Sequence, residues 1–126
     1  HVVNDIERVG DHAVNVGDYL KTITDENIRM SEESTEEIRE MFHQVKELLM
    51  LSLKAFRTRD VQLLDGVYPM EQRVDEMERE LTNRHIERLT RNMCNLRSGM
   101  IFTDLASNLE RVADHATNIA FSIKQD

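Results

Sequence analysis

The chain has 126 residues, enough for one small domain with its own core. Charged residues make up 32% and hydrophobic residues 40%, with one Pro, four Gly and no Trp, which is typical of long solvated helices rather than of a sheet. The net charge of −8 argues against a nucleic-acid partner and against a polybasic membrane patch.

The first half of the chain predicts two amphipathic helices. Apolar residues alternate at spacings of three and four over residues 2–23, which predicts one helix with a single apolar stripe. A polar connector follows over residues 24–34. Ser34 and Glu37 have the spacing of a capping box, so we expect the second helix to begin there and to run to about Phe56.

The second half predicts two more helices. Asp60 is the expected N-cap of a helix that runs to about Met93, and Pro69 is expected to kink it or to split off a first turn. The expected apolar stripe of this helix is Leu63 or Leu64, Val67, Met70, Val74, Met77, Leu81, His85 and Leu89. The last helix is predicted from about Arg97 to Lys124, with an apolar stripe of Ile101, Leu105, Leu109, Val112, Ala116, Ile119 and Ile123. Short connections between long helices predict an all-α, antiparallel up-down bundle.

Two simple features bear on the compartment and on the extent of the chain. Cys94 is the only cysteine, so no internal disulfide can form, which fits a reducing compartment. The longest apolar stretch is far too short to span a bilayer. Because the chain begins at His1 rather than at Met, we interpret it as part of a longer protein.

An internal repeat joins the first and last predicted helices. Residues 7–16 align with residues 110–119, and seven of the ten positions are identical. The apolar stripe explains the matched apolar positions, but it does not explain why Glu, Arg, Asp, His and Asn recur. Exposed positions tolerate substitution at a cost of at most about 0.5 kcal/mol, so their retention suggests chemistry.

The repeated acidic pair has the spacing of metal ligands. Glu110 and Asp114 lie one helical turn apart, so both carboxylates can reach one cation. Glu71 and Asp75 have the same spacing on the preceding helix, and antiparallel packing would bring the two pairs face to face. Asp104 lies on the polar side of the last helix. Oxygen ligands of this kind suit hard cations such as Mg, Ca, Mn or Fe.

Other interpretations remain open at this stage. The acidic pairs can be ordinary solvated surface, with Arg8 bound to Asp11 and Arg111 bound to Asp114. The recurring His and Asn side chains can be outer ligands of a metal, hydrogen-bonding groups or simply packing groups at the helix seam. These side chains are His12, Asn15, His115 and Asn118.

Catalysis has no positive support in the sequence. A ferritin-like di-iron bundle needs Glu-x-x-His on two helices, and only Glu40 and His43 supply one. There is no Gly-rich phosphate loop, zinc-protease pattern or nucleophile elbow. We therefore expect a non-enzymatic protein.

Residues 4–15 and the repeat at 110–114 closely resemble the signature of PhoU-like domains. The resemblance implies two three-helix repeats, with residues 1–23 as the last helix of a truncated first repeat, 24–34 as a linker and 35–126 as a complete second repeat. It implies that Glu7 and Asp11 bind a first metal cluster. Glu110 and Asp114 would bind a second, helped by Glu71, Asp75 and Asp104.

The same resemblance implies a function. PhoU-like proteins are negative regulators of phosphate uptake, and some bind iron or zinc clusters through these carboxylates. The residues 1–8 are most similar to the version fused behind the membrane part of bacterial sodium/phosphate cotransporters, which implies a cytoplasmic module tethered to the inner face of the membrane. A metal-free helical interaction module is the alternative. The first helix should pack on the bundle as a fourth helix, or two chains should pair to cover its apolar stripe.

Overall fold

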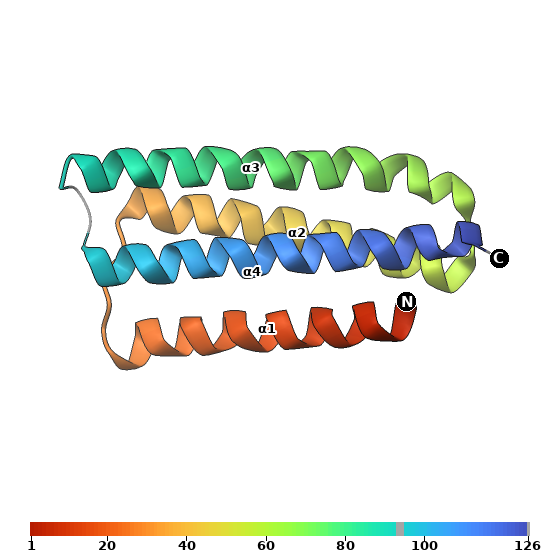
Figure 1. Ribbon diagram of the computed structural model, residues 1–126, viewed down its shortest axis with the longest axis horizontal. Helices are drawn as coiled ribbons and strands as arrows, with labels where there is room; N and C mark the ends of the chain where they lie inside the picture. Colours follow the sequence, from red (N-terminus) through yellow and green to blue (C-terminus); the bar gives the residue numbers. More distant parts are fainter. Residues whose placement is uncertain (93–94, 126) are drawn as a thin grey trace.

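The chain folds as an up-down bundle of four long helices in a computed structural model that describes residues 1–92 and 95–125 (Figure 1). The helices are α1 (Val2–Asp25), α2 (Glu32–Thr58), α3 (Leu64–Thr90) and α4 (Leu96–Phe121). Short 3-10 turns, η1 (Val61–Leu63) and η2 (Ser122–Gln125), precede α3 and follow α4. Helices α2 and α4 run in one direction, and α1 and α3 run in the other. The predicted all-α antiparallel bundle is confirmed.

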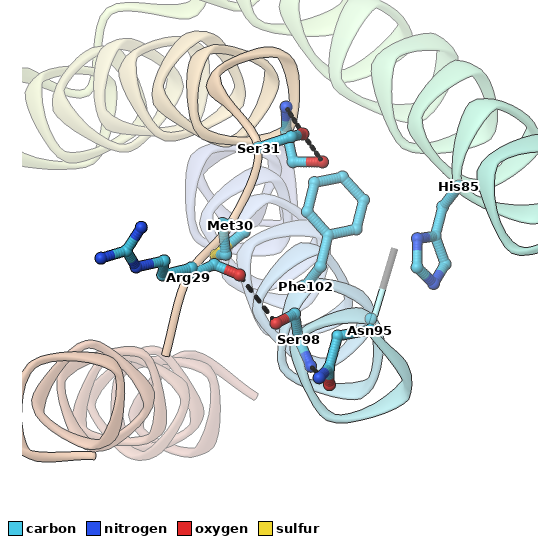
Figure 2. Close-up of a pocket in the computed structure, with 9 residues that line it drawn as sticks. Arg29, Met30, Ser31, His85, Asn95, Ser98 and Phe102 are labelled. Atoms are coloured by element: carbon cyan, nitrogen blue, oxygen red, sulfur yellow. Dashed lines mark hydrogen bonds between the residues drawn. The ribbon is translucent and has the colours of Figure 1, made fainter. Parts of the chain in front are cut away.

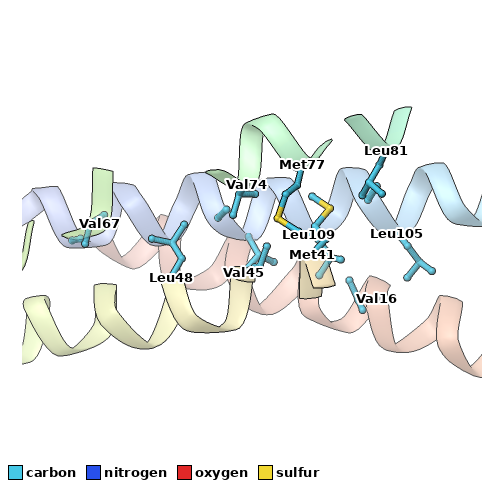
Figure 3. Packing of buried hydrophobic residues seen from close by; sticks show 14 of the residues in the cluster. Val16, Met41, Val45, Leu48, Val67, Val74, Met77, Leu81, Leu105 and Leu109 are labelled. Atoms are coloured by element: carbon cyan, nitrogen blue, oxygen red, sulfur yellow. The ribbon is translucent and has the colours of Figure 1, made fainter. Parts of the chain in front are cut away.

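Helix α4 is the centre of the bundle, because α1, α2 and α3 all pack against it. Its whole predicted apolar stripe is buried, together with Phe102 and several alanines on neighbouring faces. On α2 and α3 the buried side chains follow the predicted stripes and interlock in a single core (Figure 3). The largest fully buried side chains are Met41, Leu48, Leu105, Ile119, Val67 and Val74.

Two details of the helix starts differ from the prediction. Helix α2 begins three residues earlier than expected, because Ser31 rather than Ser34 is its N-cap. The hydroxyl of Ser31 accepts the backbone N–H of Ser34. Asp60 caps the 3-10 turn η1 by accepting the N–H of Gln62, and α3 begins only after that turn. The predicted end of this helix near Met93, and Cys94, lie outside the described residues.

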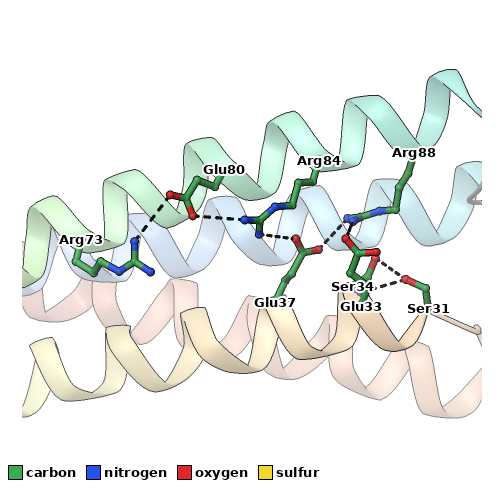
Figure 4. Close-up of polar contacts among 8 residues, drawn as sticks. All are labelled: Ser31, Glu33, Ser34, Glu37, Arg73, Glu80, Arg84 and Arg88. Carbon is green, nitrogen blue, oxygen red and sulfur yellow. Dashed lines mark hydrogen bonds and ion pairs between the residues drawn. The ribbon is translucent and has the colours of Figure 1, made fainter.

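One predicted core position on α3 is wrong. Leu89 was expected to continue the buried stripe after His85, but it is exposed, and Arg88 is buried in its place. The Arg88 guanidinium lies 3.0 Å from a carboxylate oxygen of Glu37, which is also buried. Figure 4 shows this pair within a ladder of ion pairs between α2 and α3. Burial of a charged side chain is tolerated here because the opposite helix supplies its partner.

The α1–α4 seam explains part of the internal repeat. On one side of the seam, the carboxylate of Asp5 accepts hydrogen bonds from His115 (2.8 Å) and Asn118 (3.2 Å). On the other side, the side-chain amide oxygen of Asn108, the repeat counterpart of Asp5, accepts hydrogen bonds from His12 (3.0 Å) and Asn15 (3.2 Å). The contacts therefore obey an approximate two-fold symmetry that exchanges α1 and α4.

At the centre of this seam the rings of His12 and His115 stack, with centroids 5.8 Å apart. Burial alone would raise the pKa of Asp5, but the hydrogen bonds from His115 and Asn118 outweigh it, and the pKa is lowered. The recurring His and Asn side chains are thus explained as groups that join the two helices. The seam does not explain why the Glu and Asp side chains of residues 7, 11, 110 and 114 recur, because these side chains lie outside it.

We expect Asp5→Ala to loosen α1, since it leaves the donors of His115 and Asn118 without their acceptor in a half-buried seam. The cost should be about 1–3 kcal/mol of the free energy of unfolding. Faster amide hydrogen exchange confined to α1 would report the loosening. Asp5→Asn is the matched control: Asn108 already fills the equivalent place, so this change should leave α1 docked. Unchanged exchange in Asp5→Ala would contradict the assigned role of the seam.

Candidate metal site on helices α3 and α4

Acidic side chains from α3 and α4 converge on the side of α4 that faces away from α1. Asp75, Glu110 and Asp114 each present an oxygen atom, and these atoms all lie within 4.8 Å of one another. All three side chains are half-buried. The convergence arises because α3 and α4 are antiparallel, so carboxylates one turn apart on each helix meet at the same level.

The convergence raises the pKa values of the cluster. Burial, the charge of Asp114 and a hydrogen bond with Asp114 raise the pKa of Glu110 to about 7. Burial and the same Asp114 charge also raise the pKa values of Glu71 and Asp75. Since like charges held together in a half-buried place disfavour ionisation, a bound cation would relieve a repulsion already present in the fold.

No arginine neutralises the repeated acidic pair. Within the described part of the chain, no ion pair joins Arg111 to Asp114 or Arg8 to Asp11. Arg79 is the cation that lowers the pKa of Asp75, and burial and Asp114 outweigh it. The alternative in which each acidic pair is held by its neighbouring arginine is therefore not what the structure contains.

The raised pKa values predict how the stability of the metal-free protein depends on pH. Glu110 titrates near 4.5 in an unfolded chain and near 7 in the fold, so the folded state binds more protons between these values. The free energy of unfolding should therefore fall as the pH rises from about 4.5 to about 7. Chemical denaturation across this range, with chelator present, measures the slope.

The substitution Glu110→Gln should flatten this slope. At pH 8 it should raise the free energy of unfolding by about 1 kcal/mol, allowing for solvent screening at a half-buried group. Glu7→Gln, at the repeat counterpart on α1, is the matched control and should change stability by less than about 0.5 kcal/mol. Equal slopes in the parent and Glu110→Gln would contradict the electrostatic account of the cluster.

The remaining predicted ligands lie elsewhere. Glu7 and Asp11 are exposed on α1, and among the described residues they belong to no group of three or more potential metal ligands. Asp104 accepts a hydrogen bond from Tyr19 of α1 (3.0 Å) and so belongs to the α1–α4 seam. Among the seven predicted metal ligands, the structure gathers Asp75, Glu110 and Asp114 and sets Glu71 beside them.

One acidic residue that the sequence analysis did not single out borders the cluster. Glu78, one turn beyond Asp75 on α3, raises the pKa of Glu110 by its charge and so borders the cluster. The spacing of four and three between Glu71, Asp75 and Glu78 places all three on one face of α3, and this pattern could have predicted the position of Glu78. Glu40 and His43, the single ferritin-like pair, are both exposed on α2, where His43 lies 3.4 Å from Glu47.

Comparison with known protein families shows to which family the chain belongs. The family model of the PhoU domain matches residues 38–123. The chain belongs to the PhoU family. The match spans most of α2 and all of α3 and α4, and it therefore includes the acidic cluster of the PhoU domain. The resemblance read from the repeated acidic residues is confirmed at the level of the family.

The PhoU relatives that match this chain are named for a phosphate transport system. A PhoU homologue of Caulobacter vibrioides is 36% identical over 91% of this chain and 49% of its own length. PhoU homolog 1 of Thermotoga maritima is 29% identical over 92% of this chain and 49% of its own length. Both are named phosphate-specific transport system accessory proteins. The chain thus spans about half the length of the curated relatives it matches. No solved structure matches it significantly.

None of the described helices has an apolar stretch of the length and hydropathy that a bilayer span requires. This agrees with the short apolar runs noted in the sequence.

Proposed function

We propose that this PhoU domain is a regulatory, non-catalytic module of phosphate transport that binds a metal ion between α3 and α4. The observation that carries the proposal is the convergence of Asp75, Glu110 and Asp114 within 4.8 Å. Membership of a family whose relatives are named as phosphate-transport accessory proteins supports the regulatory part.

The ligand set suits a hard cation. Asp75, Glu110 and Asp114 offer carboxylate oxygens only, and no His or Cys belongs to the group. Glu71 lies near enough for the charges of Asp114 and Asp75 to raise its pKa, but it is outside the group. Divalent manganese or divalent or trivalent iron fits such ligands better than zinc, which takes nitrogen and sulfur ligands in most structural sites. A bound ion would fix the relative position of α3 and α4 and present a neutralised face to a partner.

We propose a phosphate transporter, or the membrane portion of one, as the partner. The site of action would then be cytoplasmic, at the inner face of the membrane. The similarity of residues 1–8 to sodium/phosphate cotransporter proteins raises a second version, in which the domain is fused to the transporter. The sequence upstream of His1 separates the two versions, since apolar spans of about 20 residues there would mark the fused form.

Metal analysis tests the proposal directly. The purified protein, stripped with chelator, loaded with Mn(II) or Fe(II) and passed through a desalting column, should retain metal by elemental analysis. A protein that retains neither ion would support the alternative of a metal-free interaction module.

The oligomeric state is a separate prediction. Helix α1 packs on the bundle as a fourth helix, which is the first of the two arrangements expected from the sequence. Its apolar stripe nevertheless leaves Ile6 and Leu20 about half exposed, at 49% and 47%. Pairing of two chains through this stripe stays a prediction, and light scattering after size-exclusion chromatography would detect the dimer.

A further inference from the structure

A cavity with both polar and apolar walls lies at the end of the bundle where α2 and α4 both begin. Its volume is about 280 Å³, and Figure 2 shows the side chains around it. The linker between α1 and α2, the first turns of α2 and α4, and one residue of α3 form its walls. The polar lining residues are Arg29, Ser31, Ser34, His85, Asn95 and Ser98.

The cavity is rich in unused hydrogen-bond donors and has no carboxylate in its lining. The hydroxyl of Ser34 accepts from Ser31, so its own proton is free to donate. The amide oxygen of Asn95 accepts the N–H groups of Arg97 and Ser98, which leaves its NH₂ group without a described acceptor. A cavity of this kind favours a ligand that accepts several hydrogen bonds.

His85 points to a missing ligand more directly. The side chain is 93% buried, being 7% exposed, yet within residues 1–92 and 95–125 it makes no hydrogen bond. Its ring leans on Phe102 with centroids 5.3 Å apart. Gly99 leaves the space for it, because a Cβ atom there would lie 2.6 Å from the His85 ring. The ring nitrogens of His85 are not fully enclosed, so they remain open to a ligand in the cavity that the ring lines.

Helix dipoles favour an anion at this end of the bundle, although the chain as a whole is acidic and Glu32, in the first turn of α2, makes no ion pair with a described residue. Helices α2 and α4 are parallel, so the positive ends of both helix dipoles face this end of the bundle. The nearby carboxylates of Glu26, Glu33 and Glu37 are each held by an arginine. Arg29 lies at the rim with its side chain directed outward in Figure 2, and it makes no ion pair with a described residue.

We propose that this cavity binds a tetrahedral oxyanion of the size of phosphate or sulfate. The hydroxyl of Ser34, the amide of Asn95 and a ring N–H of His85 would donate to its oxygens, and the dipoles of α2 and α4 would supply the favourable field. The anion would contact the linker to α1 and the starts of two helices. This site shares no residue with the acidic cluster, so it goes beyond the proposed metal-dependent function.

Calorimetric titration with inorganic phosphate at pH 7, in chloride of constant ionic strength, is the test. We expect binding with Kd on the order of 1 mM. A second titration with sulfate tells whether the site prefers phosphate: a neutral histidine ring can accept the proton that phosphate carries and sulfate lacks. Absence of heat with both anions would overturn the proposal.

Variants place the binding at this cavity. Ser34→Ala removes one donor but keeps the α2 cap, which uses the hydroxyl of Ser31 and the backbone N–H of Ser34. It should weaken binding roughly tenfold, and His85→Leu should weaken it at least as much. Thr35→Ala, at an exposed neighbour outside the cavity, is the matched control and should bind like the parent.

One outcome would overturn the proposal, and another would separate the anion site from the metal site. Equal affinity in the parent, Ser34→Ala and His85→Leu would overturn it, because the anion would then bind elsewhere. Circular dichroism melting verifies that each variant is folded, and Ser34→Ala keeps the test valid should His85→Leu unfold. Phosphate binding that persists in Glu110→Gln supports a site independent of the acidic cluster.

Discussion

Combined replacement of Glu110 by Gln and Asp114 by Asn is expected to abolish metal retention. These residues supply two of the three oxygen ligands that converge with Asp75. Neutral amides bind hard cations far more weakly than carboxylates, so affinity should fall roughly 100-fold or more. Elemental analysis of metal-loaded, desalted protein should show a filled site in the parent and an empty one in the variant.

The counterpart variant on α1 makes this test specific. Glu7→Gln with Asp11→Asn makes the same chemical change in the matching repeat, where the described residues form no group of three potential metal ligands. It should keep the metal content of the parent. Equal loss of metal in both variants would mean that α1 carries a ligand set of its own, and retention in the Glu110 and Asp114 variant would remove the proposed site.

Removal of Arg88 should cost more stability than any surface substitution in the chain. Its guanidinium lies 3.2 Å from Glu33 and 3.0 Å from Glu37, and it covers the ring of Phe102 at 5.5 Å. Arg88→Ala would leave the buried Glu37 with one partner fewer. Breaking a buried pair costs about 3–5 kcal/mol, and the lower end applies because Arg84 also binds Glu37.

Urea denaturation measures this cost, and Arg84→Ala is its control. Arg84 touches the same carboxylate at 3.0 Å, but its side chain is half exposed, so its removal should cost less than about 1 kcal/mol. Double replacement of Arg88 and Glu37 by Met should recover most of the loss, because both buried charges then disappear together. Similar costs for Arg88→Ala and Arg84→Ala would contradict the role of burial.

The apolar periodicity was sufficient to predict the bundle. Spacings of three and four located all four helices, and every residue of the predicted stripe of the last helix is buried, together with residues on neighbouring faces of α4. Periodicity could not choose between Arg88 and Leu89, since both lie near the stripe after His85. The choice depends on Glu37, which lies on another helix and became identifiable only in three dimensions. The start of α2 was missed because Ser31 and Ser34 are both credible caps.

The candidate site was predictable in part. The spacing of Glu110 and Asp114, with the matching pair on α3, was enough to anticipate a convergence of carboxylates. The sequence could not distinguish a repeat retained for chemistry from one retained for packing, and the α1–α4 seam accounts for the recurring His and Asn residues by packing. Asp5 was overlooked because its counterpart is Asn108, yet the identity of the surrounding His and Asn residues marked both positions as one side of a seam.

The pairing of α1 with α4 also bears on how the chain folds. Helices α2, α3 and α4 follow one another as two hairpins, so their contacts close short loops. The bond between Asp5 and His115 joins residues 110 positions apart, and closing so long a loop is entropically unfavourable until its ends are already structured. The three-helix unit should therefore assemble first, and α1 should add to a preformed surface in the last step.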